Sequence, residues 1–371
     1  MARSLTSATP VRATIALAAL RHNLARLQAA APASKVLATI KANAYGHGAV
    51  QAAQALDAAA AFGVARLGEG LELREHGITK PIVLMEGVFT DEELALALEH
   101  KLDLVVHADY QIDLLERRVR ALSSKKSGSA RVIWLKLDTG MSRLGFPSGE
   151  TAAAAARLRA NPLVGELRGM THFARADEPA ASMTAEQLRR FNAELVGLDV
   201  PITGVANSAA ILSATVGQHE WVRPGIALYG SSPLSDRAAE SLGLKPVMTL
   251  STQVIGLRTI NAGDSVGYGA SWRAARPSRI ATLAAGYADG VPRHLPSGAP
   301  VLVAGRRAPL VGRVSMDMIT VDVTDVPEVA IGTSAVLWGD GLPVDEVAAA
   351  AGTISYELLC GVTRRVAFDY V

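Results

Sequence analysis

Reactive side chains stand directly after short apolar segments in the first two thirds of the chain. Lys41 follows the apolar segment Val36–Ile40 and precedes Ala-Asn-Ala-Tyr-Gly-His-Gly. A lysine at the end of a strand can extend along apolar surface to reach solvent. It can also form a Schiff base with the carbonyl group of a cofactor. Lys41 alone leaves both interpretations open.

Arg223 follows a second apolar segment, Glu220–Val222. Arginine keeps its proton at accessible pH. If Arg223 faces the pyridine nitrogen of pyridoxal phosphate, that nitrogen has to stay unprotonated. The ring then withdraws electrons less strongly, which favours return of a proton to Cα over transamination. The alternative interpretation is an ordinary surface arginine.

Other polar residues occupy equivalent positions after further apolar segments. Ser208 supplies a hydroxyl, and backbone N–H groups at Gly225 and Ile226 suit a phosphate group, as glycine turns and helix starts often do. His172 is compatible with a satisfied core histidine, and no second His or Cys stands at metal-ligand spacing, so we predict no metal site. The complete set after these segments is Lys41, Lys136, Asp138, Arg143, His172, Asn207, Ser208, Arg223, Gly225 and Ile226.

The elements that must position these residues alternate between strand and helix patterns. Amphipathic stretches lie between the apolar segments, for example Ala49–Ala58, Glu92–Glu99, Gln111–Leu122 and Ala185–Leu198. Eight strands alternating with helices indicate an α/β fold with an N-terminal (β/α)8 TIM-like barrel over residues 1–240. Since catalytic groups of such barrels follow the C-terminal ends of the strands, the polar residues are expected to converge at one mouth. The predicted strands are Val36–Ile40, Ala61–Ala65, Ile82–Leu84, Leu102–Val106, Val132–Leu137, Leu167–Thr171, Ile202–Val205 and Glu220–Val222.

Residues 241–371 have a different pattern. Short segments rich in β-branched residues are separated by Gly, Pro and Asp, which predicts a C-terminal, mostly antiparallel β domain. The Ser-, Pro- and Gly-containing stretch Ser231–Leu244 is the expected linker. The predicted strands are Val247–Leu257, Arg279–Ala284, Pro300–Val303, Met318–Val323 and Ser334–Trp338.

Composition narrows the class of protein. The 371 residues are 49% hydrophobic and 19% charged, which is typical of a globular protein with two domains. The net charge of +2 and the lack of basic runs interleaved with aromatic residues argue against nucleic acid as a partner. One cysteine excludes an intrachain disulfide, and charges interrupt every apolar segment before membrane-spanning length, so we expect a cytoplasmic protein without a membrane partner.

Taken together, the motifs resemble those of the alanine racemase family over nearly the whole chain. Their order and spacing fit the family, and the set is far more specific than any one motif. The matching segments are Ile40-Lys-Ala-Asn-Ala-Tyr-Gly-His-Gly48, Lys136-Leu-Asp-Thr-Gly-Met-Ser-Arg-Leu-Gly145, Thr171-His-Phe-Ala174, Ala206-Asn-Ser208, Arg223-Pro-Gly-Ile226, Val266-Gly-Tyr-Gly269, Gly286-Tyr-Ala-Asp-Gly290 and Gly312-Arg-Val-Ser-Met-Asp317.

The resemblance implies pyridoxal 5'-phosphate as cofactor and the interconversion of L-alanine and D-alanine as the reaction. Lys41 would carry the cofactor and serve D-alanine as base, and Tyr268 of a second subunit would serve L-alanine. Racemisation needs a proton acceptor on each face of a planar carbanion, which one lysine cannot supply. The resemblance therefore implies a homodimer with shared active sites. The D-alanine would be used for peptidoglycan synthesis or be broken down.

Further roles follow from the same resemblance. Arg143 and the Met316 backbone N–H would bind the substrate carboxylate, and His172 and Arg223 would assist Tyr268. Lys136 is similar to a lysine that is carbamylated in many family members, and Asp317 would support the site. The expected cofactor contacts are Tyr45, His172, Asn207, Ser208, Arg223, Gly225, Ile226 and Tyr356, and the expected substrate corridor is Asp177, Tyr287, Arg293 and Arg313. Ser315 departs from the family pattern, which often has Cys before Met-Asp, and we expect little effect from it.

Three alternatives remain at this point. A basic amino-acid decarboxylase of the same architecture would also need a barrel lysine, but Arg223 and Tyr268 argue against it. A racemase of broader specificity would differ in the width of its pocket. A non-catalytic protein that only binds pyridoxal phosphate would leave the long C-terminal domain without a purpose.

Overall fold

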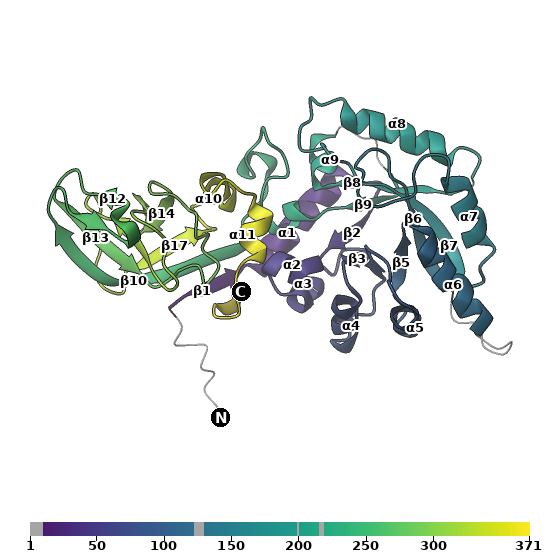
Figure 1. The fold of residues 1–371 in the computed structure, drawn as a ribbon, viewed down its shortest axis with the longest axis horizontal. Coiled ribbons are helices and arrows are strands. Elements are labelled where there is room, and N and C mark those ends of the chain that lie inside the picture. The colour runs from purple at the N-terminus through teal and green to yellow at the C-terminus, as the bar shows by residue number, and fades with distance from the viewer. Residues whose placement is uncertain (1–9, 122–129, 199, 215–218) are drawn as a thin grey trace.

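The structure of the chain is a computed structural model. The structure describes residues 10–121, 130–198, 200–214 and 219–371. A barrel ringed by helices and an elongated β domain lie side by side (Figure 1). No helix among the described residues is long and apolar enough to span a membrane.

The barrel consists of eight parallel strands, and its last strand, β9, pairs with its first, β2. This confirms the predicted barrel, although β7 begins three residues earlier than expected and β8 ends two residues later. The strands are β2 (Lys35–Thr39), β3 (Ala61–Val64), β4 (Ile82–Leu84), β5 (Asp103–Val106), β6 (Arg131–Lys136), β7 (Val164–Met170), β8 (Ile202–Asn207) and β9 (Trp221–Arg223).

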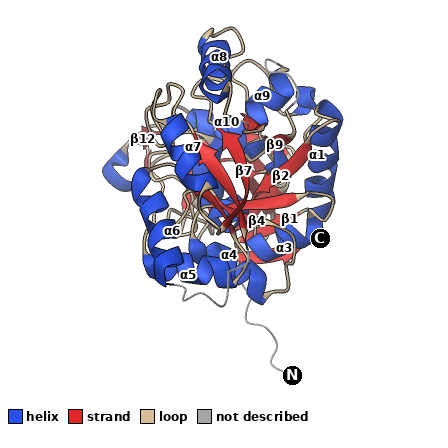
Figure 2. Ribbon diagram, turned by 90° about the vertical axis from the view of Figure 1, so that its right-hand side faces the viewer, coloured by secondary structure: helices blue, strands red, loops and turns tan. Residues whose placement is uncertain are grey.

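Helices cover the outside of the barrel (Figure 2). In α6, Ile112 and Leu115 are three residues apart and both are buried, as expected of a helix with one apolar face. The start of α5 is capped by the Thr90 hydroxyl, which accepts a hydrogen bond from the Glu93 backbone. The helices are α1 (Leu17–Ala30), α3 (Ala49–Ala55), α4 (Leu67–Glu75), α5 (Asp91–Glu99), α6 (Asp109–Ala121), α7 (Thr151–Arg159), α8 (Met183–Leu195) and α9 (Ser208–Ser213).

Side chains fill the interior of the barrel. Trp134 and Trp221 meet edge to face there, together with Leu37, Val105 and Met170. The Arg168 guanidinium lies over both indole rings, 5.2 Å and 4.9 Å from their centres. Because the barrel is packed rather than hollow, a site for a small molecule has to lie at one of its ends.

The second domain is built on an eight-stranded sheet with the path β15-β14-β17-β10-β1-β18, and β13 pairs with β10 while β16 pairs with β13. A separate pair of strands, β11 and β12, lies outside this sheet. Most pairings are antiparallel, as predicted. The strands from the C-terminal part are β10 (Met248–Ile260), β11 (Ser265–Val266), β12 (Trp272–Arg273), β13 (Ser278–Leu283), β14 (Pro300–Val303), β15 (Arg306–Pro309), β16 (Ile319–Asp322), β17 (Ser334–Trp338) and β18 (Ala367–Tyr370).

One strand of this sheet comes from the other end of the chain. β1 (Arg12–Ile15) pairs antiparallel with β10 and parallel with β18. An ion pair between Arg12 and Asp369, 2.5 Å long, adds a side-chain contact to the β1–β18 pairing. The prediction that residues 12–15 belong to the barrel is therefore wrong. A four-residue strand buries Ala13 and Ile15 in any sheet, so its pattern carries no information about which sheet it joins.

Two short helices of the second domain lie between the two bodies (Figure 1). They are α10 (Val344–Ala350) and α11 (Ser355–Cys360), and α11 packs against α2 (Lys41–Gly46), the segment that follows the first barrel strand. The second domain thus contributes directly to the mouth of the barrel.

Candidate active site

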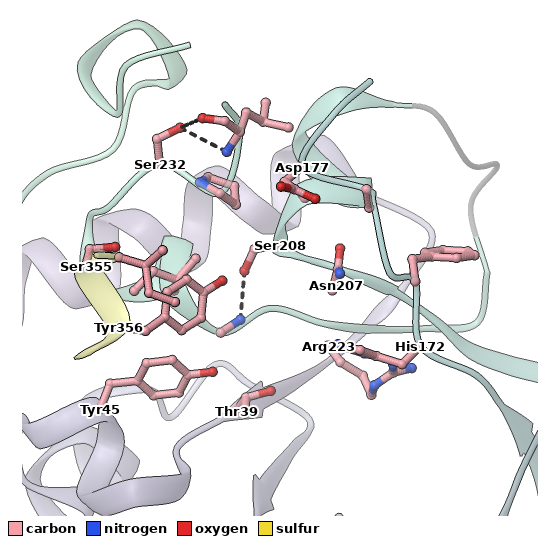
Figure 3. Close-up of a pocket in the computed structure, with 18 of the residues that line it drawn as sticks. Thr39, Tyr45, His172, Asp177, Asn207, Ser208, Arg223, Ser232, Ser355 and Tyr356 are labelled. Atoms are coloured by element: carbon pink, nitrogen blue, oxygen red, sulfur yellow. Dashed lines mark hydrogen bonds between the residues drawn. The ribbon is translucent and has the colours of Figure 1, made fainter. Parts of the chain in front are cut away.

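A pocket of about 770 Å³ opens where the C-terminal ends of the barrel strands meet the second domain. The barrel contributes Thr39, Lys41, Arg143, His172 and Arg223, which end or follow strands, and α11 contributes Tyr356. Figure 3 shows Tyr45 and Tyr356 at one end of the pocket and Arg223 and His172 at the other. Of the predicted site residues, the pocket brings together Lys41, Tyr45, Arg143, His172, Asp177, Asn207, Ser208, Arg223, Gly225, Ile226 and Tyr356.

The backbone directly after Lys41 is unusual. Four consecutive residues, Ala42 to Tyr45, have φ between 52° and 54° and ψ between 41° and 51°, which is the left-handed helical conformation. A left-handed residue other than glycine costs about 1–2 kcal/mol, so four in a row need compensating contacts. Because the chain makes this turn, both Lys41 and Tyr45 line the same pocket. This conformation was not predicted from the sequence, and only Asn43 belongs to a residue type that tolerates it readily.

The Tyr45 end of the pocket is crowded and polar. The Ser208 hydroxyl accepts hydrogen bonds from the backbone N–H groups of Gly225 (2.8 Å) and Ala227 (3.4 Å), so its own hydrogen is free to donate to a ligand (Figure 3). A Cβ atom on Gly225 would lie 2.5 Å from the Tyr45 hydroxyl, so a larger residue there would displace the phenol. Burial raises the pKa of Tyr356 to about 12 and also raises that of Tyr45, which keeps both hydroxyls protonated as donors.

Asn207 has a second role in the structure. It is the residue before α9, and its side-chain oxygen accepts a hydrogen bond from the Ala210 backbone at 3.0 Å. This contact caps the helix that presents Ser208. Asn207 therefore lines the pocket and also fixes the position of its neighbour.

The opposite end of the pocket is formed by a buried arginine, Arg223, which has no carboxylate as hydrogen-bond partner in the part of the chain that the structure describes. The Arg223 guanidinium donates to the backbone oxygens of Gly204 and Thr171 and to His172 Nδ1, which is 3.3 Å away. Since His172 accepts through Nδ1, the remaining hydrogen of its neutral ring is on Nε2. Burial and then the charge of Arg223 lower the pKa of His172 to about 3, so the ring is neutral at pH 7.

Positive charge dominates this site. The charges of Lys41, Arg143 and Arg223 all act on Lys136 and on His172, and Glu86 opposes them at Lys136. Lys136 is the last residue of β6, and burial followed by these cations lowers its pKa to about 8. A site with this excess of cations is suited to a ligand that carries several negative charges.

The predicted cofactor fits these residues. Pyridoxal phosphate carries a phosphate and a phenolic oxygen, and the pocket offers the Ser208 and Tyr45 donors at one end and cations along its length. Gly225, whose missing Cβ leaves room beside Tyr45, keeps that end open. Among the described residues, no group of three or more His, Cys, Asp or Glu side chains could hold a metal ion.

Lys136 ends the barrel strand β6 and Asp138 follows it, whereas the other predicted residues that do not line the pocket lie on loops of the second domain. Tyr268 begins the short 3-10 helix η4 (Tyr268–Ala270) with 69% of its surface exposed, and Met316 is 52% exposed. The loop of Tyr287 is joined to that of Met316 by backbone hydrogen bonds, and Asp317 forms an ion pair with Arg365 at 2.7 Å. We call Tyr268, Tyr287, Arg313 and Met316 the second cluster; these residues and Arg293 do not line the pocket of their own chain.

Several pocket residues were not predicted from the sequence. Thr39, Met85 and Met141 line the barrel side, while Asp345, Ser355 and Cys360 come from α10 and α11. The residues of α10 and α11 carry no motif of their own, because their place in the pocket results from how the two domains meet. Ser355 and Cys360 lie on the short helix of Tyr356, and that proximity is the one signal that could have found them.

The fold and the site define a two-domain barrel protein whose pocket, at the C-terminal ends of the barrel strands, is lined by a lysine and two arginines. Family models described as "Alanine racemase, N-terminal domain" and "Alanine racemase, C-terminal domain" match residues 15–233 and 247–370. The alanine racemase of Azoarcus sp. (strain BH72) is 51% identical over 362 residues, 97% of this chain and 99% of that protein. A crystal structure of the biosynthetic alanine racemase from Pseudomonas aeruginosa has a TM-score of 0.93 at 49% identity, with 98% and 99% of the two chains covered. The structure of alanine racemase from Acinetobacter baumannii has a TM-score of 0.90 at 38% identity, with 98% and 100% of the two chains covered. The chain belongs to the alanine racemase family.

Proposed function

We propose that this protein is an isomerase that interconverts L-alanine and D-alanine, with pyridoxal 5'-phosphate in the pocket described above. The observation that carries the proposal is the convergence of Lys41, Tyr45, Ser208 and Arg223 on one electropositive pocket in a member of this family. When bound, the cofactor supplies an aldehyde that condenses with amines and a ring that delocalises the electron pair left at Cα.

Different residues of the pocket would bind different parts of the cofactor and the substrate. Tyr45, Ser208 and Tyr356, with the backbone at Gly225 and Ile226, would bind the phosphate group. Arg223 would donate to the ring nitrogen, which its permanent charge keeps unprotonated. Arg143 would bind the carboxylate of alanine, and the Met316 backbone of a partner would bind it from the other side.

Proton transfer needs a base on each face of Cα. Lys41 Nζ would hold the proton on one face, and Tyr268 Oη of a second copy would hold it on the other. His172, with its hydrogen on Nε2, would assist Tyr268, and the Arg223 hydrogen bond to Nδ1 keeps this tautomer in place. Asp177, Tyr287, Arg293 and Arg313 would line the route to the site, and Asp317 would support the Met316 loop.

Lys136 would be carbamylated in the working enzyme. Its lowered pKa leaves part of the amine neutral near pH 8, and the neutral amine is the form that adds to carbon dioxide. The resulting carbamate anion would face Arg143 and relieve the repulsion among the four cations. We further propose that the protein is a homodimer and that it is cytoplasmic. The barrel domain would end at residue 240, and the β domain would begin at residue 241.

Two experiments test this function. The first measures deuterium incorporation at Cα from heavy water with L- and D-alanine, with serine, lysine and arginine as comparisons. Exchange with inversion of alanine and little with the others is expected; inert alanine beside racemisation or decarboxylation of a larger amino acid would refute the substrate or the reaction.

The second experiment mixes two inactive variants, Lys41→Ala and Tyr268→Phe, under conditions that exchange subunits. If each site combines Lys41 of one copy with Tyr268 of the other, a mixed dimer has one intact site and one doubly altered site. Equal mixing should then restore about a quarter of the wild-type activity, because about half of the dimers are mixed. No recovery, together with an active monomer in sedimentation, would show that the sites are not shared.

A further inference from the structure

The left-handed turn of Ala42–Tyr45 joins the two residues that matter most for the cofactor, and it needs to be held in place. Its first N–H, that of Ala42, donates to the Glu69 carboxylate at 2.6 Å. The same carboxylate accepts from the backbone of Ala65 and Arg66, which fixes Glu69 at the start of α4. The beginning of the turn is therefore tied to the next strand–helix connection of the barrel.

The end of the turn is held by His47, a fully buried residue to which the pocket gives no role. His47 Nδ1 lies 2.9 Å from the carbonyl oxygens of both Ala44 and Tyr45. Because both partners are acceptors, Nδ1 must carry the hydrogen and donate it. Burial lowers the pKa of His47 to about 4, so the ring is neutral and has one N–H to give.

Aromatic stacking fixes the direction of this donor. The His47 ring stacks on Tyr229 with 4.6 Å between ring centres, and Tyr45 stacks on Tyr229 at 4.7 Å. The Tyr229 hydroxyl donates to the Thr39 backbone at the end of β2. The Tyr45 ring and the His47 ring thus pack on the same residue, Tyr229, which is itself hydrogen-bonded to the barrel.

The His47 ring is satisfied on one side only. Its Nε2 atom is buried and has no hydrogen-bond partner among the described residues. A residue chosen for stability alone would avoid such an unpaired acceptor. The contact that histidine provides here is the Nδ1 donor.

We infer that His47 is a positioning residue, which holds the left-handed turn through Ala44 and Tyr45 and so sets the Lys41 amine and the Tyr45 hydroxyl for the cofactor. This inference rests on the proposed function for the identity of the cofactor. The hydrogen bonds from His47 to the turn are present in the protein without cofactor.

A pair of variants separates the donor from the ring. His47→Phe keeps a ring to stack on Tyr229 but has no donor, whereas His47→Asn places an amide nitrogen near the Nδ1 position without a ring. We expect H47F to speed amide hydrogen exchange across residues 42–48 of the cofactor-free protein, and to weaken pyridoxal phosphate binding, each by about tenfold, as for one lost hydrogen bond. H47N should stay close to wild type in both measurements.

His76 provides the matched control. Its Nδ1 atom also bonds a backbone oxygen, that of Glu72 at 2.9 Å, but this contact closes the end of α4 away from the turn. His76→Phe should leave exchange at residues 42–48 and cofactor absorbance unchanged. If H47F behaves like wild type, or if H47N is damaged as much as H47F, the inference is overturned.

Relief of backbone strain gives an independent test. Ala42 is exposed and has φ of 52°, a conformation that glycine adopts without a Cβ clash. Ala42→Gly added to H47F should restore part of the exchange protection and cofactor affinity. Ala152→Gly, at an exposed position of the right-handed helix α7, should restore neither. Absence of recovery with A42G would contradict the role assigned to the turn.

One measurement needs no variant, and so stands even if H47F does not fold. Long-range 1H–15N correlation of the histidine rings in the cofactor-free wild type should show His47 as the neutral Nδ1–H tautomer. An Nε2–H tautomer would overturn the inference. Failure of pyridoxal phosphate to bind the wild type would instead refute the proposed function and leave the exchange and tautomer results interpretable.

Discussion

Replacing Lys136 by methionine should stabilise the protein without cofactor and carbon dioxide. Lys136 is partly buried at the end of β6, and the charges of Arg223, Arg143 and Lys41 oppose its own. The fall of its pKa from 10.5 to about 8 corresponds to about 3 kcal/mol of free energy, since one pKa unit is worth ~1.4 kcal/mol. Methionine keeps an unbranched side chain of similar length and removes the charge.

The pH dependence of this stabilisation follows from the lowered pKa of Lys136. Below pH 8 the lysine is protonated in both the folded and the unfolded states, so the whole penalty is present. Between pH 8 and 10.5 the folded state has already released a proton that the unfolded state still binds, and stability rises with pH. The advantage of Lys136→Met should therefore be about 3 kcal/mol at pH 7 and should vanish above pH 10.5.

Urea unfolding followed by circular dichroism measures this difference at a fixed protein concentration, in buffers free of carbon dioxide. Lys245→Met, at an exposed position, serves as the control and should change little at either pH. A K136M variant that is less stable than wild type at pH 7, or whose advantage persists unchanged at pH 10.5, would refute the electrostatic reasoning.

Three further results are expected. In 13C-labelled bicarbonate, NMR of the wild type should show a carbamate resonance that is lost in K136M. The reason is that about a quarter of the Lys136 amine is neutral at pH 7.5, against about 0.1% for an ordinary lysine. If the wild-type and K136M spectra are the same, this modification is excluded. Tyr268→Phe should keep cofactor absorbance but slow Cα exchange from L-alanine about a hundredfold or more, the usual contribution of a general base, while exchange from D-alanine persists; equal exchange from both enantiomers would remove Tyr268 as second base. Gly225→Ala should weaken pyridoxal phosphate binding about tenfold, because its Cβ would stand 2.5 Å from the Tyr45 hydroxyl; a spectrophotometric titration that matches wild type would show that Tyr45 can move without cost.

The barrel and most of its site were predictable because their signals are local. Each barrel strand is a short apolar run, and the residue that follows it reaches the mouth in any barrel of this kind. Lys41, His172, Ser208 and Arg223 could therefore be assigned to one pocket before the structure was known. The C-terminal strands were predictable from β-branched segments between turns, for the same reason.

Features that depend on distant parts of the chain were not predictable. The four residues of β1 join a sheet whose other members begin more than 230 positions later, and their alternation fits many partners. The left-handed turn contacts Glu69, His47 and Tyr229, whereas the two alanines of its own Ala-Asn-Ala-Tyr sequence would favour a right-handed helix. In both cases the conformation is decided by contacts that a window of neighbouring residues does not contain.

The electrostatics of the pocket give a reason, independent of family, to look outside the chain for the second base. His172 has a pKa of about 3 and lies against Arg223, so it is a poor proton acceptor at pH 7. Tyr45 and Tyr356 have pKa values raised by burial and hold their protons. Of His172, the two tyrosines and Lys41, the lysine is left as the suitable acceptor, and it serves one face of Cα. The second cluster includes an exposed tyrosine, Tyr268, which does not line the pocket of its own chain. A second copy that brings Tyr268 to the Arg223–His172 end would supply the missing acceptor where His172 Nε2–H can meet it. The subunit-mixing experiment tests that arrangement directly.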